Sequence, residues 1–310
     1  MSDVAVMYHY VMDDKGWGGI HPLLPKQFEQ QIDLLAQSFD IVSPNELDKK
    51  GGSKPRCVLT FDDGTKDHFE YAFPILLKKG VPAYFAVLSG PILTGEIPIV
   101  HLNHVVLSFR SDESIWQLLS QKYNTSHVHE FVLKNNIYHY EHELLRRCNK
   151  YILNFMLSEQ EARSFLEEIF LEIYSDKMEF IDNFYLNNQE IILMDKKGMT
   201  IGVHGHSHLP FTGDAKTFFN MEISPCFEYL KETIGITPEW YTPAYGGGSE
   251  SKRMMTELEP ILKRTGFKGG FSTVPGLNKG LNQFWLNRID CIHLPPQSKL
   301  SINEALLCIE

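Results

Sequence analysis

Short apolar runs and longer amphipathic segments follow one another through most of the chain. Continuous apolar runs rich in β-branched and aromatic residues are typical of strands buried on both faces of a sheet. They predict strands at residues 4–11, 39–42, 57–61, 83–88, 199–203, 239–242, 269–272 and 284–289. Apolar residues at helical spacing predict helices between them, at residues 25–37, 68–79, 190–197, 215–234, 251–265 and 301–308. This alternation predicts an α/β fold whose parallel sheet is closed, or nearly closed, into a barrel.

Residues 89–188 do not follow the alternation. They contain few β-prone runs, and segments 112–122, 140–155 and 159–174 show helical spacing of apolar side chains. We therefore expect a single domain over residues 1–310 that carries a large helical insertion at about residues 90–188. The insertion is rich in Tyr, Asn and His, so a substrate-facing cap and a solvated helical subdomain are both open interpretations.

Composition and charge narrow the class of protein and its partners. The chain of 310 residues is 43% hydrophobic and 22% charged, which is typical of a globular protein with a sizeable core. Its net charge is -10, and no dense block of Lys and Arg is present. Nucleic acid and anionic membranes are therefore disfavoured as partners.

Targeting signals and cysteines indicate the compartment. The amino terminus lacks a basic region followed by a long apolar stretch, and no later segment approaches a membrane-spanning run. Five scattered cysteines without a CxxC pair suit reduced thiols better than a disulfide scaffold. We expect a cytoplasmic protein without stable membrane insertion, and the sequence predicts nothing about its oligomeric state.

Two clusters of polar residues follow predicted strands and suggest a metal site. Asp62 and Asp63 come directly after the run 57–61, and Gly64 permits the chain to turn there. His204 and His208 follow the run 199–203 at a spacing of i and i+4. Two imidazoles and one carboxylate are a usual ligand set for a catalytic divalent metal. These residues fall at the carboxyl ends of barrel strands, where such folds place their chemistry, and predict a metallohydrolase.

The segments 60–64 (TFDDG) and 204–208 (HGHSH) resemble the first two signatures of the polysaccharide deacetylases, the NodB-homology or carbohydrate esterase family 4 fold. The resemblance extends to the segments MYHYV at 7–11, YTPAYG at 241–246 and LNRI at 286–289, and leaves the helical insertion outside. It implies a distorted (β/α) barrel of about seven parallel strands. It also implies hydrolysis of N-acyl, usually N-acetyl, groups on amino sugars with one divalent metal, most often zinc.

The resemblance assigns roles to individual residues. It implies that Asp63, His204 and His208 bind the metal and that Asp62 is the general base. The backbone N–H of Tyr245 is expected to stabilise the tetrahedral oxyanion.

The chain departs from the family pattern at two points. Thr242 stands where relatives carry an Arg that steadies the base, and Arg288 is a candidate replacement from the other side of the barrel mouth, with a surface salt bridge as the alternative. Relatives also carry a late Leu-x-His as general acid, whereas this chain offers only His293 in a poorly matching context. Relatives that open with Tyr-His-x-Val place a first-strand His in the active site, so we favour His9 as general acid over His293 or a buried histidine.

The expected activity is metal-dependent removal of an N-acetyl group from an amino sugar or from a sugar-containing precursor of a surface glycan. The expected partner is a small carbohydrate or glycan precursor. Two alternatives stay open: an N-deformylase or amidase acting on a non-sugar amide, and a catalytically inactive carbohydrate-binding relative.

Overall fold

The structure, a computed structural model, describes residues 2–13, 15–47, 54–278 and 284–309. The chain divides into two compact units. The first unit comprises Met1–Asp13, Pro22–Glu96 and Ile181–Glu310, and the second comprises Asp14–His21 and Ile97–Phe180. That the two behave as one domain with an insertion stays a prediction.

The first unit is built on a parallel sheet. Among the described residues its strands run in the order β8-β7-β6-β5-β4-β3-β1-β9, and β2 pairs with β3. Their bounds are Val4–Tyr8 (β1), Asp40–Ile41 (β2), Arg56–Phe61 (β3), Tyr84–Leu88 (β4), Thr200–Gly205 (β5), Trp240–Tyr241 (β6), Gly269–Phe271 (β7), Trp285–Leu286 (β8) and Ile289–Asp290 (β9). Every ladder between these strands is parallel. The predicted parallel α/β fold is confirmed.

The sheet curls because its two ends are joined by a short piece of chain. The prediction of one strand at 284–289 is wrong, since β8 pairs with β7 whereas β9 pairs with β1. Only Asn287 and Arg288 separate β8 from β9. Consecutive Cα atoms are 3.8 Å apart, so Leu286 and Ile289 lie within about 11 Å of each other. The sheet therefore curls into a distorted (β/α) barrel whose two edge strands meet at Asn287 and Arg288, with no ladder between β8 and β9 among the described residues.

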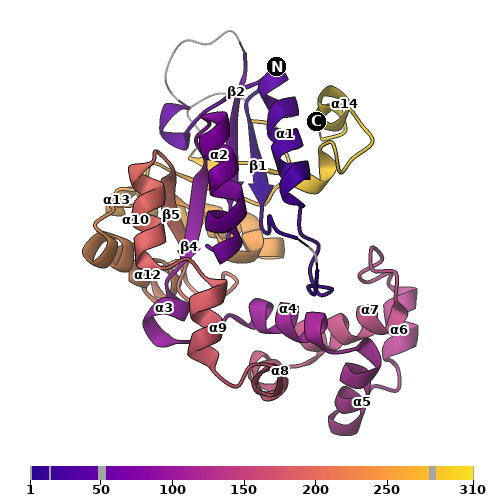
Figure 1. Cartoon of the computed structure of the whole chain (residues 1–310). Helices are drawn as coiled ribbons and strands as arrows, with labels where there is room; N and C mark the ends of the chain where they lie inside the picture. Colours follow the sequence, from indigo (N-terminus) through magenta and orange to yellow (C-terminus); the bar gives the residue numbers. More distant parts are fainter. Residues whose placement is uncertain (1, 14, 48–53, 279–283, 310) are drawn as a thin grey trace. The chain divides into compact units, whose positions relative to one another are not determined.

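Helices surround the sheet of the first unit, and Figure 1 shows α1 and α2 next to each other beside β1. The helices are Pro25–Ser38 (α1), Pro44–Glu46 (η1), His68–Ala72 (η2), Phe73–Lys79 (α2), Gly90–Thr94 (α3), Asn188–Lys196 (α10), Ala215–Phe218 (α11), Phe219–Ile223 (η4), Ser224–Glu228 (α12), Tyr229–Ile234 (η5), Ala244–Glu250 (η6), Ser251–Thr265 (α13), Cys291–His293 (η7) and Ile302–Leu307 (α14). Helix α9 (Lys177–Phe184) crosses the boundary between the units.

Two apolar clusters distinguish the outside of the barrel from its inside. The larger cluster joins alternate strand residues, such as Val6 and Phe85, to helix residues such as Phe28 and Leu258. The smaller contains the intervening strand residues and no helix residue: Ala5, Val58, Tyr84, Ala86, Trp240, Phe271 and Leu286. Because side chains alternate along a strand, the smaller cluster fills the barrel interior.

The second unit is helical in its described residues. It contains Ile99–Phe109 (α4), Asp112–Lys122 (α5), Val128–Lys134 (α6), Leu144–Tyr151 (α7), Ile152–Met156 (η3) and Glu159–Ile173 (α8). Apolar side chains on each of these helices are buried, which gives the unit a core of its own. In the described part of the chain, no helix has the length and apolar character needed to cross a membrane. A cytoplasmic location stays a prediction.

Candidate metal centre

The carboxyl ends of the strands bring the predicted polar residues to one edge of the barrel. Alternate residues along a strand share one face, so Thr60 and Asp62 lie on the same inner face as Val58. By the same alternation Thr242 lies on the inner face with Trp240. Arg288 contacts both Thr60 and Asp62. The interior of the barrel therefore ends in polar groups above a layer of apolar side chains.

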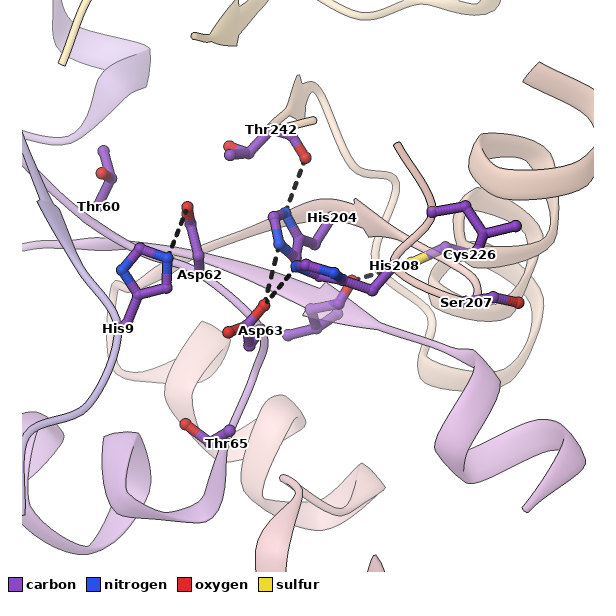
Figure 2. Close-up of polar contacts among 12 residues, drawn as sticks. His9, Thr60, Asp62, Asp63, Thr65, His204, Ser207, His208, Cys226 and Thr242 are labelled. Atoms are coloured by element: carbon purple, nitrogen blue, oxygen red, sulfur yellow. Dashed lines mark hydrogen bonds and ion pairs between the residues drawn. The ribbon is translucent and has the colours of Figure 1, made fainter. Parts of the chain in front are cut away.

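Asp63, His204 and His208 form a compact cluster (Figure 2). Asp63 Oδ1 lies 3.0 Å from Nε2 of His204 and 3.2 Å from Nε2 of His208. One ligand atom from each residue falls within 4.8 Å of the others, and all three residues are buried. No other group of three potential metal ligands meets this criterion in the part of the chain that the structure describes.

The hydrogen bond of His204 shows that the cluster fits a cation. Nδ1 of His204 lies 2.8 Å from the carbonyl oxygen of Thr242 and must donate to it, since a carbonyl only accepts. In the neutral ring, Nε2 then presents its lone pair to the Asp63 carboxylate. Two electron-rich atoms 3.0 Å apart repel each other unless a proton or a metal ion lies between them.

The protonation equilibrium of His204 agrees with this interpretation. Burial alone lowers the pKa of the imidazole, but the carboxylates of Asp63 and Asp62 outweigh burial and raise the pKa above its usual value. The site therefore favours positive charge at Nε2, whether it is supplied by a proton or by a metal ion.

The backbone around the cluster is strained. Asp63, His208 and Tyr245 adopt φ values of 77°, 58° and 54°, in the left-handed region that residues with a Cβ rarely occupy. Each such residue costs on the order of 1–3 kcal/mol, and strain of this kind concentrates at functional sites. Gly64 follows with φ 68°, and a Cβ there would lie 3.0 Å from Val87.

Glu222 holds the loop that carries His208. Its buried Oε2 accepts hydrogen bonds from the N–H of Ser207 at 3.0 Å and of Leu209 at 3.3 Å. Burial raises the pKa of the Glu222 carboxyl, and these backbone donors partly offset the effect. The sequence does not distinguish Glu222 as functional, because the segment 215–234 also carries Glu228 and Glu232, which are exposed.

Asp62 is paired with Arg288 inside the barrel. Nη1 of Arg288 donates to Oδ1 of Asp62 at 2.7 Å and to Thr60 Oγ1 at 3.2 Å, while its Nε donates to the carbonyl of Ser272 at 2.8 Å. Arg288 is 1% exposed, which excludes the surface salt bridge. Burial alone raises the pKa of Asp62, but the charges of Arg288, His204 and His9 and the hydrogen bond from Arg288 together outweigh burial and lower the pKa, so the carboxylate stays ionised.

His9 lies on the other side of Asp62 from His204, as Figure 2 shows. Its Nε2 is 3.9 Å from Asp62 Oδ2, and its side chain is 45% exposed. His293 is exposed on η7, and the structure records no contact between it and Asp62 or Asp63 within the described residues.

The backbone next to His9 is held by residues of the loop after β3. The N–H of Val11 donates to Oδ2 of Asp67 at 2.7 Å, and Nε2 of His68 contacts the carbonyl oxygen of His9. Asp67 directly precedes the helix η2, but its side chain makes no cap hydrogen bond there. The long-range bond to Val11 takes the place of that local contact.

Thr242 and Tyr245 complete the edge of the site. The Thr242 hydroxyl donates to Tyr84 at 3.1 Å, and its carbonyl orients His204, a backbone role that sequence analysis missed. The exposed Tyr245 ring lies edge-on to His208, with centroids 4.6 Å apart.

Comparisons with known proteins point to one family. The sequence model of the polysaccharide deacetylases matches residues 118–268, a range that contains both site histidines but neither Asp62 nor Asp63. A search of curated proteins finds no match.

Solved structures share the fold. The Streptococcus pyogenes deacetylase PplD in complex with acetate is 16% identical, with a TM-score of 0.58 over 99% of this chain and 98% of that chain. IcaB from Ammonifex degensii is 16% identical, with a TM-score of 0.56 over 93% and 91%. A de-N-acetylase from Aggregatibacter actinomycetemcomitans is 15% identical, with a TM-score of 0.55 over 99% and 100%.

Proposed function

The chain belongs to the polysaccharide deacetylase family by the match over residues 118–268 and by its fold, and on that premise we propose that it removes N-acetyl groups from an amino sugar or a sugar-containing precursor of a surface glycan. The observation that carries the proposal is the buried cluster of Asp63, His204 and His208 beside the ionised pair of Asp62 and Arg288. A pure carbohydrate-binding protein would have no use for an ionised carboxylate held at such a cluster.

We assign Asp63, His204 and His208 as ligands of one divalent cation, with zinc as the expected ion. Two neutral imidazoles and one carboxylate leave a bound dication net positive. When bound, the cation would polarise the acyl carbonyl and make an attacking water more acidic. The hydrogen bond from His204 to the Thr242 carbonyl fixes the ring so that Nε2 is available as a ligand.

Asp62 acts as the general base in this proposal. Its Oδ1 is held by Arg288, so Oδ2 is the oxygen that accepts a proton from water as water attacks the acyl carbon. Arg288 keeps the carboxylate ionised, replacing the Arg that relatives carry at the position of Thr242.

The remaining steps need an oxyanion donor and a general acid. The backbone N–H of Tyr245 stabilises the oxyanion, and His9 gives a proton to the leaving nitrogen as the C–N bond breaks. The products are acetate and a free amino group. His9 suits this role because its ring lies at Asp62 and reaches solvent, which can restore its proton.

The test measures bound metal and released acid on the same protein preparations. The substrate panel contains N-acetylated and N-formylated amino sugars and matched non-sugar amides. We expect metal-dependent acetate release from the N-acetylated sugars. This release should be lost in Asp63→Ala and kept in Asp182→Ala, which removes an exposed carboxylate.

Other outcomes identify the alternatives. Preferred formate release would indicate a deformylase, and turnover of the non-sugar amides would indicate a different amidase. Metal binding without turnover of any substrate in the panel would contradict the proposed deacetylase.

A further inference from the structure

The second unit carries a continuous row of five aromatic rings, formed by Phe131, Tyr151, Phe155, Tyr138 and Tyr140. Successive ring centroids in this aromatic row are 5.1, 6.1, 6.0 and 5.9 Å apart. The rings come from α6, the segment after α6, α7 and η3. Residues from four places in the sequence therefore build one surface feature.

Every second ring of the aromatic row is strongly exposed. Phe131, Phe155 and Tyr140 are 44%, 66% and 55% exposed, whereas Tyr151 and Tyr138 between them are partly buried. Single exposed apolar side chains are normal on a protein surface, but contiguous ones mark binding sites. Each exposed ring contacts a partly buried one, which restricts its rotamers and so limits the entropy that binding would cost.

Polar groups are placed against the rings. Nζ of Lys150 lies 4.9 Å from the centroid of Tyr138 and 5.1 Å from that of Tyr140, and it is paired with Glu141 at 2.6 Å. Nδ2 of Asn154 donates to the Tyr138 hydroxyl at 2.7 Å. The row thus combines apolar ring faces with polar groups that are held in place: the cationic Lys150, the anionic Glu141 and the neutral amide of Asn154.

The backbone provides an independent sign of function. Among the described residues, five with a Cβ have positive φ: three are at the metal centre, and the other two are Asn136 and Tyr138. Tyr138 belongs to the aromatic row and Asn136 lies two residues before it. Strain of this kind persists where a side chain must be held in a set position.

We propose that the aromatic row binds a glycan chain of N-acetylated amino sugars, an inference that rests on the proposed deacetylase activity. A sugar ring has an apolar face of C–H groups, which stacks on aromatic rings, and a rim of hydroxyl and amide groups, which needs donors and acceptors. The row offers both. A membrane surface would instead favour a basic patch, and Glu141 neutralises the cation here.

The location of the chemistry supports this division of labour. Every residue assigned to the metal centre belongs to the first unit, so the second unit is not needed to build it. A longer glycan offers more sugar faces to the aromatic row itself, so the row would bind long chains more tightly than monomers without changing the reaction. The aromatic row should therefore discriminate substrates by chain length.

The test compares binding of N-acetylglucosamine monomer and hexamer to the metal-stripped full-length protein by calorimetry. The double variant Tyr140→Ala/Phe155→Ala should weaken hexamer binding about tenfold, because it removes two of the three strongly exposed rings of the aromatic row. The variant Tyr140→Phe/Phe155→Tyr keeps both rings and should bind the hexamer like the wild type. Leu171→Ala removes an equally exposed apolar side chain of the same unit, outside the row, and should have no effect.

Hexamer binding that is unchanged in the double alanine variant would overturn the proposal. So would a native dimer that becomes monomeric in that variant, because the aromatic row would then be a contact between two copies of the chain. Turnover is scored separately. Ring-dependent hexamer binding without acetate release would support the aromatic row and contradict the deacetylase, whereas acetate release with ring-independent binding would do the reverse.

Discussion

Among the described residues, those with a Cβ at positive φ lie at the candidate metal centre and in or next to the aromatic row, yet the two regions differ in what they expose to solvent. At the candidate metal centre two of the strained residues, Asp63 and His208, hold polar side chains that are buried. In the aromatic row Tyr138 helps to keep apolar rings in solvent. Buried charges depend on every partner, because an unpaired charge in the interior is costly. Exposed rings contribute separately, so single changes there should be mild.

The largest expected effect is at the general base. Asp62→Asn should lower kcat by about 10²–10⁴-fold, since the amide cannot accept a proton. Metal content should stay at the wild-type level because Asp62 is not an assigned ligand. Stopped assays of acetate release together with metal analysis would check both. Full activity in Asp62→Asn would show that another group is the base.

Removing Arg288, the partner of Asp62, should alter both the stability of the fold and the pH dependence of kcat/KM. Arg288→Met leaves a buried carboxylate without its cation, which should lower the free energy of unfolding by about 3–5 kcal/mol. Since Arg288 lowers the pKa of Asp62, its loss raises that pKa, and the base is protonated at higher pH. The acid limb of kcat/KM should therefore move to higher pH.

The conservative variant Arg288→Lys is the control, because it retains the charge. Its acid limb should lie between those of the wild type and Arg288→Met. Denaturant titration gives the free energy of unfolding, and pH–rate profiles give the pH of the acid limb of kcat/KM. An unchanged acid limb in Arg288→Met would separate Arg288 from the ionisation of Asp62.

Glu222 should act on the metal without touching it. Glu222→Ala releases the N–H groups on both sides of His208, and changes of this kind weaken metal affinity by about 10–100-fold. Glu222→Gln keeps an acceptor oxygen and should recover most of the affinity. Competition with a chromogenic chelator measures the metal affinity of each protein. Equal metal affinity in all three proteins would leave Glu222 with a purely structural role.

The smallest effect is expected on the surface of the second unit. Phe155→Ala removes an exposed ring and should change the free energy of unfolding by less than about 0.5 kcal/mol. Metal affinity should not change. Thermal melting and chelator competition would reveal any larger effect, and a loss of metal affinity would break the separation between the two regions.

The sequence predicted the parallel sheet and the meeting of the Asp and His pairs for identifiable reasons. Apolar runs report burial, and strands buried on both faces with helices between them permit few arrangements. The Asp pair and the His pair each follow such a run, so parallel pairing brings them to one edge. The family roles assigned to these residues stay predictions until they are tested.

The features that the sequence could not predict depend on which strands pair and which distant residues form hydrogen bonds, rather than on burial. The run 284–289 is apolar except for Asn287 and Arg288, and the strands on either side of these two residues pair with opposite ends of the sheet, a fact that hydrophobicity does not encode. Glu222 and the Thr242 carbonyl act on the site through hydrogen bonds between segments far apart in the sequence. The pairing of Arg288 with Asp62 could be suggested, but only the closed barrel gives it a distance.

The most direct test of the metal centre is X-ray absorption at the zinc edge of the zinc-loaded protein. We predict one ion per chain with two imidazole nitrogens at about 2.0–2.1 Å, oxygen ligands, and no sulfur. The imidazole signal should be reduced in His204→Ala. Sulfur ligation, or a spectrum that is the same in the wild type and in His204→Ala, would contradict the assignment of Asp63, His204 and His208 as the ligands.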